Sequence, residues 1–153
     1  MDDKTFQREG SCRCGRVRLR VDARPLVTMA CHCTGCQKMS SSAYSLSAAI
    51  PAQSFAVVEG EPVAGGLHGQ ARHMFCPHCM SWMFTRIDGM DWFVNVRTTM
   101  LDDPASLPPF IESWTAEKLP FAQTGAPHSY AGFPPMEDFG RLMEEYRGWE
   151  PVR

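Results

Sequence analysis

The cysteines of this chain fall into three tight clusters whose spacing indicates metal binding. The 153-residue sequence contains seven cysteines. They form a Cys-x-Cys pair, a Cys-x-Cys-x-x-Cys group and a Cys-x-x-Cys pair: Cys12 and Cys14; Cys31, Cys33 and Cys36; Cys76 and Cys79. A zinc ion takes four ligands in a tetrahedron, and closely spaced thiolates can converge on one ion. Seven thiols therefore predict one closed site with four ligands and one open site with three.

The two cysteine pairs predict a structural zinc site. Cys76 and Cys79 have the spacing of a zinc knuckle, in which the chain turns back after the first thiol. The tighter pair, Cys12 and Cys14, can chelate from a kinked strand end. Joined, the pairs would hold one ion between segments about sixty residues apart. Metal binding would then be coupled to folding.

The middle cluster predicts a different kind of site. Cys31, Cys33 and Cys36 place three ligands within six residues and leave a fourth coordination position for water or substrate, as in catalytic zinc sites. Three thiolates around a dication leave a net charge of about −1, so the ion is a weak Lewis acid. Such a site is better suited to binding and deprotonating an incoming thiol than to generating hydroxide.

Two other interpretations of the cysteines stay open at this point. In the first, all seven cysteines stabilise the fold, and His32 or another side chain completes the middle site. In the second, Cys76-Pro77-His78-Cys79 is a redox dithiol like that of some disulfide oxidoreductases. Redox use needs the first cysteine at a helix N-terminus, whereas residues 81–84 have strand character.

The composition is that of an ordinary globular protein and predicts a single zinc-binding domain over residues 1–153. Apolar residues make up 44% and charged residues 21% of the chain, which can bury a core without help from a metal. The net charge of −2 argues against nucleic acid as a partner. The N-terminal residues lack the pattern of a secretory signal, and no apolar stretch is long enough to span a bilayer. We therefore expect a cytoplasmic protein with reduced thiols and no membrane partner.

The elements that would position the cysteines are mainly short strands. Val17, Leu19 and Val21 alternate with polar residues, which is the period of a half-buried strand. Further strands are expected at 27–30, 43–50, 55–58, 72–75, 82–87, 92–96 and 110–114, with a turn at 88–91 that makes a hairpin of two of them. Residues 116–135 contain four prolines and are expected to be irregular. Apolar residues at helical spacing over 136–147 predict an amphipathic C-terminal helix.

With these motifs, the chain resembles the glutathione-dependent formaldehyde-activating enzyme family, which also includes relatives of centromere protein V. The resemblance follows residues 10–17, 31–38 and 72–79, extends more faintly to Trp114, and covers a core of about residues 10–115. It implies a mainly β fold of the β-tent type with zinc knuckles and two zinc ions, of which the second can be absent or labile. Cys12, Cys14, Cys76 and Cys79 would match the family's structural site, and Cys31, Cys33 and Cys36 its catalytic site.

The chain departs from the family pattern at two places beside these motifs. Met80 stands where the family usually has a glycine after the last cysteine. Residues 39–42 read Met-Ser-Ser-Ser, where the family often has a glycine. Both changes leave the predicted zinc ligands intact.

Motifs and resemblance together predict a zinc-dependent carbon–sulfur lyase or synthase that adds a glutathione-like thiol to a small aldehyde such as formaldehyde. The substrate thiol would take the open position at the middle cluster, lose its proton and attack the carbonyl carbon. Lys38 and Arg72 adjoin the clusters and are candidates for binding a substrate carboxylate, with ordinary solvated charges as the competing interpretation. The alternative function is a zinc-stabilised module without turnover, either a thiol carrier or a protein-interaction domain.

Overall fold

The computed structural model describes residues 5–67 and 69–151, and this part of the chain is mainly β. The strands are β1 (Arg8–Ser11), β2 (Arg18–Val21), β3 (Val27–Cys31), β4 (Ser45–Pro51), β5 (Phe55–Glu59), β6 (Val63–Gly65), β7 (Ala71–Phe75), β8 (Trp82–Ile87), β9 (Phe93–Arg97), β10 (Ile111–Ser113) and β11 (His128–Ser129). The α-helices are α1 (Thr34–Ser40) and α2 (Phe139–Gly148). Short 3-10 helices lie at Ala52–Ser54, Thr98–Met100, Pro104–Ser106, Thr115–Glu117 and Met136–Asp138.

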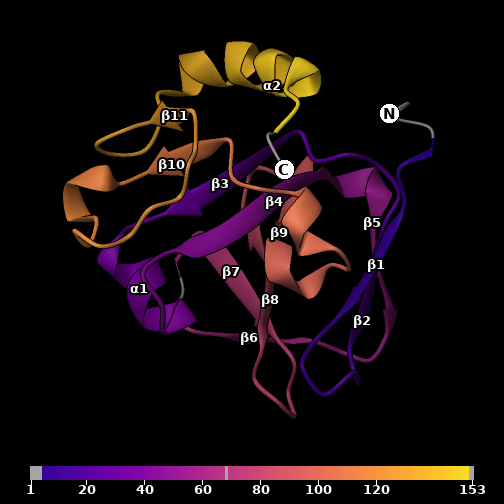
Figure 1. The fold of residues 1–153 in the computed structure, drawn as a ribbon. Coiled ribbons are helices and arrows are strands. Elements are labelled where there is room, and N and C mark those ends of the chain that lie inside the picture. Colours follow the sequence, from indigo (N-terminus) through magenta and orange to yellow (C-terminus); the bar gives the residue numbers. More distant parts are fainter. Residues whose placement is uncertain (1–4, 68, 152–153) are drawn as a thin grey trace.

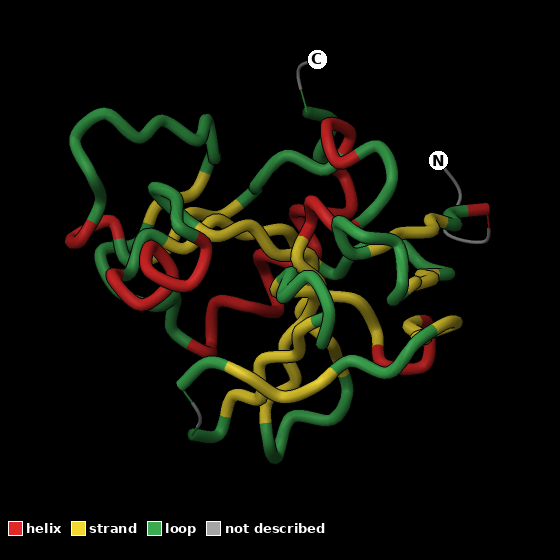
Figure 2. The backbone as a smooth tube through the Cα atoms, turned by 90° about the horizontal axis from the view of Figure 1, so that it is seen from below, coloured by secondary structure: helices red, strands yellow, loops and turns green. Residues whose placement is uncertain are grey.

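The described strands form a small sheet and a large one (Figure 1). The small sheet has the order β1-β2-β5, and the large sheet has the order β11-β10-β3-β4-β9-β8-β7-β6. Neighbours in the large sheet are antiparallel from β3 to β6, whereas β10 runs parallel to both β3 and β11. Seen from below, loops and turns form much of the periphery around the strands (Figure 2).

Two apolar clusters stabilise this arrangement. The larger one includes Leu19 and Val21 from the small sheet, together with Ile50, Val94 and other residues of the large sheet. The smaller one lies under α2, which runs along the end of the large sheet near β3 and β10 (Figure 1). Burial of apolar surface contributes about 25 cal/mol per Å². The first cluster joins the sheets, and the second attaches the C-terminal helix.

Most of the elements expected from the sequence are present. Val17, Leu19 and Val21 are all buried, as their alternation predicts. The expected hairpin is formed by β8 and β9, and the C-terminal helix begins as a 3-10 turn at Met136 and continues as α2. The segment 116–135 is irregular apart from β11 and the end of a 3-10 helix. None of the described helices has the length and apolar character needed to cross a membrane.

The helix α1 is the main element that the sequence pattern did not predict. It has seven residues, none of them buried, so no apolar stripe marks it in the sequence. Cys33 is its N-cap, and Ser41 ends it in the left-handed conformation, with φ of 51°. The middle cysteine cluster therefore spans the end of β3 and the start of α1.

Candidate metal centres

The first centre brings together the two cysteine pairs. The sulfur atoms of Cys12, Cys14, Cys76 and Cys79 all lie within 4.8 Å of one another. The Cys12 and Cys14 sulfurs are 3.5 Å apart, and the Cys14 and Cys76 sulfurs are 3.8 Å apart. Four sulfurs at the zinc–sulfur distance of about 2.3 Å in a tetrahedron would be about 3.8 Å apart. The donor set and its spacing thus fit a zinc ion, as predicted from the spacing of the pairs.

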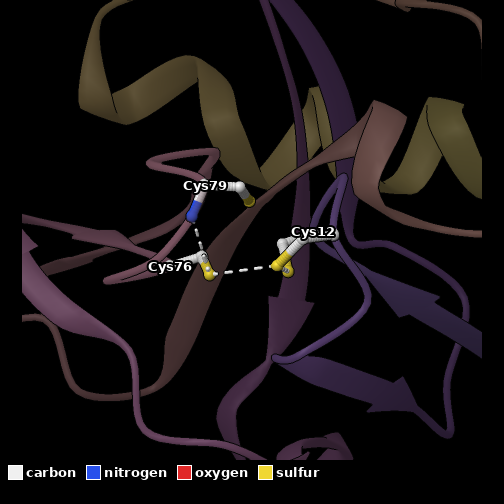
Figure 3. A group of neighbouring side chains, drawn as sticks. Cys12, Cys76 and Cys79 are labelled. Carbon is white, nitrogen blue, oxygen red and sulfur yellow. Dashed lines mark hydrogen bonds between the residues drawn. The ribbon is translucent and has the colours of Figure 1, made fainter.

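Two turns position these four thiols. Cys12 and Cys14 lie between β1 and β2, in a turn where Gly15 has a positive φ of 80°. Cys76 and Cys79 lie between β7 and β8, and the side chains drawn in Figure 3 converge from these separate segments. Cys76 therefore does not start a helix, and its setting differs from that of the redox dithiol considered above.

Backbone N–H groups already support negative charge on these sulfurs. The N–H of Val17 donates to the Cys12 sulfur over 3.4 Å, and the N–H of Cys79 donates to the Cys76 sulfur over 3.5 Å (Figure 3). The Ser81 hydroxyl lies 3.2 Å from the Cys79 sulfur, and this hydrogen bond lowers the pKa of Cys79 to about 5. Donors aimed at sulfur favour the thiolate, which is the form that binds metal.

The second centre is built from one short segment. The sulfurs of Cys31, Cys33 and Cys36 lie within 4.8 Å of one another, and all three residues are half-buried. Cys31 ends β3, Cys33 caps α1, and the Cys33 sulfur accepts the backbone N–H of Cys36 over 3.3 Å. The local backbone alone thus brings three ligands together.

The three thiols of this segment cannot all ionise independently. The hydrogen bond from Cys36 lowers the pKa of Cys31 to about 5, and the same contact raises the pKa of Cys36. Burial raises the pKa of Cys33. Neighbouring thiolates repel one another, and a divalent cation removes that penalty. These donors fit a zinc ion with three protein ligands.

A buried hydrogen bond between His32 and Glu112 holds the segment against β10. His32, between two of the cysteines, is fully buried, and its Nε2 lies 2.9 Å from Glu112 Oε2. Glu112 lies on β10 and also accepts the hydroxyls of Thr124 and Ser129, each over 2.7 Å. Burial opposes ionisation of Glu112, but these hydrogen bonds outweigh it and lower its pKa to about 2. Neither ring nitrogen of His32 belongs to the three-sulfur group.

The start of α1 is held by the 3-10 helix that follows β10. Glu117 Oε1 accepts both the backbone N–H and the hydroxyl of Thr34 over 3.1 Å. The side-chain amide of Gln37 donates to the carbonyls of His32 and Glu117, over 2.8 and 3.1 Å. The first turn of α1 is therefore anchored to residues more than eighty positions further along the chain.

A pocket of about 490 Å³ opens between the segments that follow the two centres. One wall is formed by the end of α1 and the residues after it, and another by the residues that come after Cys79 in the sequence. The lining residues are Met39, Ser40, Ser42, Tyr44, Ser45, Leu46, Met80, Ser81, Trp82, Arg97, Thr99 and Met100. Its position relative to both centres makes it the candidate substrate pocket.

The two residues suggested for carboxylate binding lie outside the lining of this pocket. Lys38 is exposed on α1. Arg72 lies on β7, where its Nε is 2.9 Å from Asp88 Oδ1, and both side chains are more than half exposed. Sequence reasoning missed Arg97 and Glu112, because their proximity to the middle cluster depends on strand register and on long-range contacts.

Comparison with known proteins identifies relatives of the chain. The family model described as "Glutathione-dependent formaldehyde-activating enzyme" matches residues 7–117. A crystal structure of a Rhodobacter sphaeroides protein superposes with a TM-score of 0.52 and 20% identity, covering 62% of this chain and 88% of that chain. This structural similarity supports the fold. A search of curated proteins finds no significant match.

Proposed function

Because the chain belongs to the glutathione-dependent formaldehyde-activating enzyme family, we propose that it is a zinc-dependent carbon–sulfur lyase or synthase. Its substrates would be a glutathione-like thiol and a small aldehyde such as formaldehyde. The observation that carries this proposal is the three-sulfur group of Cys31, Cys33 and Cys36, which has no fourth protein ligand among the described residues. Ser45, which pairs with Cys31 across β3 and β4, lines the pocket, and this pocket is the proposed place for the substrate.

The proposed reaction forms one carbon–sulfur bond. A zinc ion held by Cys31, Cys33 and Cys36 would lower the pKa of the substrate thiol and hold it as a thiolate. The sulfur lone pair attacks the carbonyl carbon, and the carbonyl π pair moves onto oxygen. The oxygen then gains a proton, which balances the proton lost by the thiol. With formaldehyde, the product is an S-hydroxymethyl adduct, which is a hemithioacetal, and the reverse sequence is the lyase direction.

The chain's own residues would hold the reacting groups in place. The buried pair of His32 and Glu112 fixes the backbone between two of the ligands. Lys38 and Arg72 remain proposed contacts for a substrate carboxylate at the outer surface, beyond the pocket wall. We also propose that the protein acts in the cytoplasm, on small molecules and without nucleic acid as a partner.

The test is exchange NMR of a thiol–formaldehyde mixture with the native protein and with Cys33→Ser. Serine is a strong N-cap residue, so this substitution keeps an acceptor at the start of α1 while removing a thiolate ligand. We expect the native protein to accelerate adduct exchange at least tenfold over Cys33→Ser. Equal exchange rates would overturn the proposal.

Metal analysis of the same samples makes the result interpretable. The native protein should hold two zinc ions, and Cys33→Ser should keep the one bound by the four-cysteine centre. A native protein that holds both ions and yet fails to accelerate exchange with any thiol would favour the alternative, a thiol carrier or protein-interaction module.

A further inference from the structure

Arg97 is a buried arginine without an ionic partner among the described residues. Only 9% of its surface is exposed, and its Nε is buried without a hydrogen-bond partner. Its guanidinium lies over the ring of Trp82, with 4.1 Å between the guanidinium carbon and the ring centroid. A buried cation is costly unless it is paired. This stacking fixes the plane of the guanidinium, and no described residue accepts a hydrogen bond from its buried Nε.

Strand register places Arg97 on the same face of the large sheet as the middle cluster. Arg97 on β9 pairs with Ser47 on β4, and Ser45 on the same strand pairs with Cys31 on β3. Residues two apart on a strand share a face, and directly paired residues do so as well. Arg97, Ser45 and Cys31 therefore project from one face, with Ser45 beside the ligand and Arg97 further across the sheet.

Arg97 and Ser45, the strand partner of Cys31, both line the pocket, whereas the three cysteines themselves are not in its lining. Arg97 is the only charged side chain in its lining. The other walls are thioethers, aromatic rings and hydroxyls, among them Met80 and Ser42 at the two departures from the family pattern. Such walls accept a soft, partly apolar group, while the hydroxyls and the guanidinium provide donors for an anion.

Burial of Arg97 changes the pKa of its guanidinium. Burial lowers the pKa of its guanidinium to about 10, and negative charge on Cys36 and Cys31 partly offsets this effect. Arg97 therefore still carries its positive charge at neutral pH.

We propose that Arg97 is a specificity-determining residue that binds the carboxylate of an anionic thiol substrate inside this pocket. This inference rests on the proposed function. A guanidinium can hold a carboxylate through two parallel hydrogen bonds, and an exposed lysine or arginine provides far less discrimination. The bound carboxylate pairs the arginine, and the thiol of the same molecule points along the shared face toward Cys31.

The test compares two thiols of nearly equal size, 3-mercaptopropionate and 3-mercaptopropionamide, each with formaldehyde and the zinc-loaded protein. The native protein should show a kcat/KM at least roughly tenfold higher for the acid, because only the carboxylate forms charge-assisted hydrogen bonds with the guanidinium. Arg97→Gln should remove this preference, mainly by raising KM for the acid, and should change the amide reaction less than threefold. Arg97→Lys should keep part of the preference.

The matched control is Arg86→Gln. Arg86 lies on β8, and its guanidinium also lies near aromatic rings, 5.4 Å from the Phe55 centroid and 5.7 Å from the Phe84 centroid. It is exposed and does not line the pocket. This variant should keep the preference for the acid.

Binding of 3-(methylthio)propionate separates this inference from the proposed function. This thioether acid has no ionisable thiol, so calorimetry reports carboxylate recognition without turnover. If neither thiol is turned over but the thioether acid binds the native protein and not Arg97→Gln, the proposed function fails and the carboxylate site stands. If both thiols are turned over without preference by the native protein, the function stands and the Arg97 proposal is overturned.

A third outcome also overturns it. If Arg97→Gln loses zinc from the middle cluster and reacts equally slowly with acid and amide, Arg97 only balances the charge of the thiolates. The native comparison of acid and amide needs no variant, so the proposal stays testable even if Arg97→Gln does not fold.

Discussion

The two cysteine centres use similar ligands but differ in how the chain assembles them. The four-cysteine centre joins two turns, and Cys14 and Cys76 in it are 62 residues apart in the sequence. The three-cysteine centre comes from six consecutive residues at the junction of β3 and α1. A ligand set spread over distant segments couples metal binding to the fold, whereas a local set can lose its metal without separating large parts of the structure. We therefore propose that the first centre stabilises the fold and that the second carries the chemistry.

The largest loss of folding stability should come from the substitution Cys76→Ser. Cys76 is fully buried in the apolar cluster that joins the two sheets. Apparent binding free energies of structural zinc reach about 10–16 kcal/mol, so loss of this ligand should cost on the order of 5 kcal/mol or more. Thermal unfolding followed by circular dichroism should show no cooperative transition near that of the native protein.

The variant Cys33→Ser tests whether the two centres differ in their importance for folding. That variant should lose one zinc ion and keep a cooperative transition, because its segment is local and its helix cap is retained. If Cys33→Ser unfolds as completely as Cys76→Ser, the division between a structural and a chemical centre is wrong.

A smaller effect is expected from Glu112→Gln, which loosens the support behind the three-cysteine centre. The pKa of Glu112 is about 2 in the folded protein, against about 4.3 in an unfolded chain. A lowered pKa stabilises the folded state above about pH 4.3, and this contribution disappears as the pH falls toward 2. The free energy of unfolding of the native protein should exceed that of the variant by about 3 kcal/mol at pH 6.

Chemical denaturation of both proteins at pH 6 and 7 measures this difference, because acid release of zinc from the cysteines would itself unfold both proteins at lower pH. The control is Glu9→Gln, because Glu9 forms an exposed pair with Arg18 and should contribute little. A loss of stability in Glu112→Gln at pH 6 that is no larger than that of the control would contradict the assignment.

The smallest predicted effect concerns Met80, which follows the four-cysteine centre and lines the pocket beside the other. Its φ is 59°, a left-handed conformation that suits glycine. Met80→Gly should relieve strain but lose chain entropy on folding, for a net stabilisation of roughly 0.5 kcal/mol. It should also widen the pocket and lower discrimination among thiols.

Met80→Ala is the matched control because it shortens the side chain and keeps the strained backbone. Both variants should accept bulkier thiols, but only the glycine variant should unfold at a higher temperature. Stabilisation of both variants to the same extent would show that the backbone carries no strain there.

Local patterns in the sequence predicted a large part of the fold. The alternation of Val17, Leu19 and Val21 reports burial of one strand face, and the turn at residues 88–91 reports a hairpin. These features can be predicted from the sequence because residues close together in the chain determine them. The cysteine spacing likewise predicted both ligand groups, since each pair or triplet is set by a few residues of backbone.

The rest of the site depends on contacts that spacing does not encode. Glu112 meets His32 across eighty residues, and Arg97 reaches the face of Cys31 only through the register of three strands. The helix α1 has no buried residue, so periodicity gave no sign of it. Neither residue type favours the positive φ of Ser41 and Met80, but both lie where the family resemblance expects a glycine, which is the one signal for this conformation in the sequence.

The parallel pairing of β10 with β3 has a consequence for the order of assembly. A ribosome releases the complete Cys31–Cys36 triplet long before it has made Cys76 and Cys79, or the Glu112 that later supports His32. Closing so long a loop is slow compared with forming local turns. We expect the local triplet to meet metal first in the growing chain, and the sheet-joining centre to close only when most of the large sheet exists.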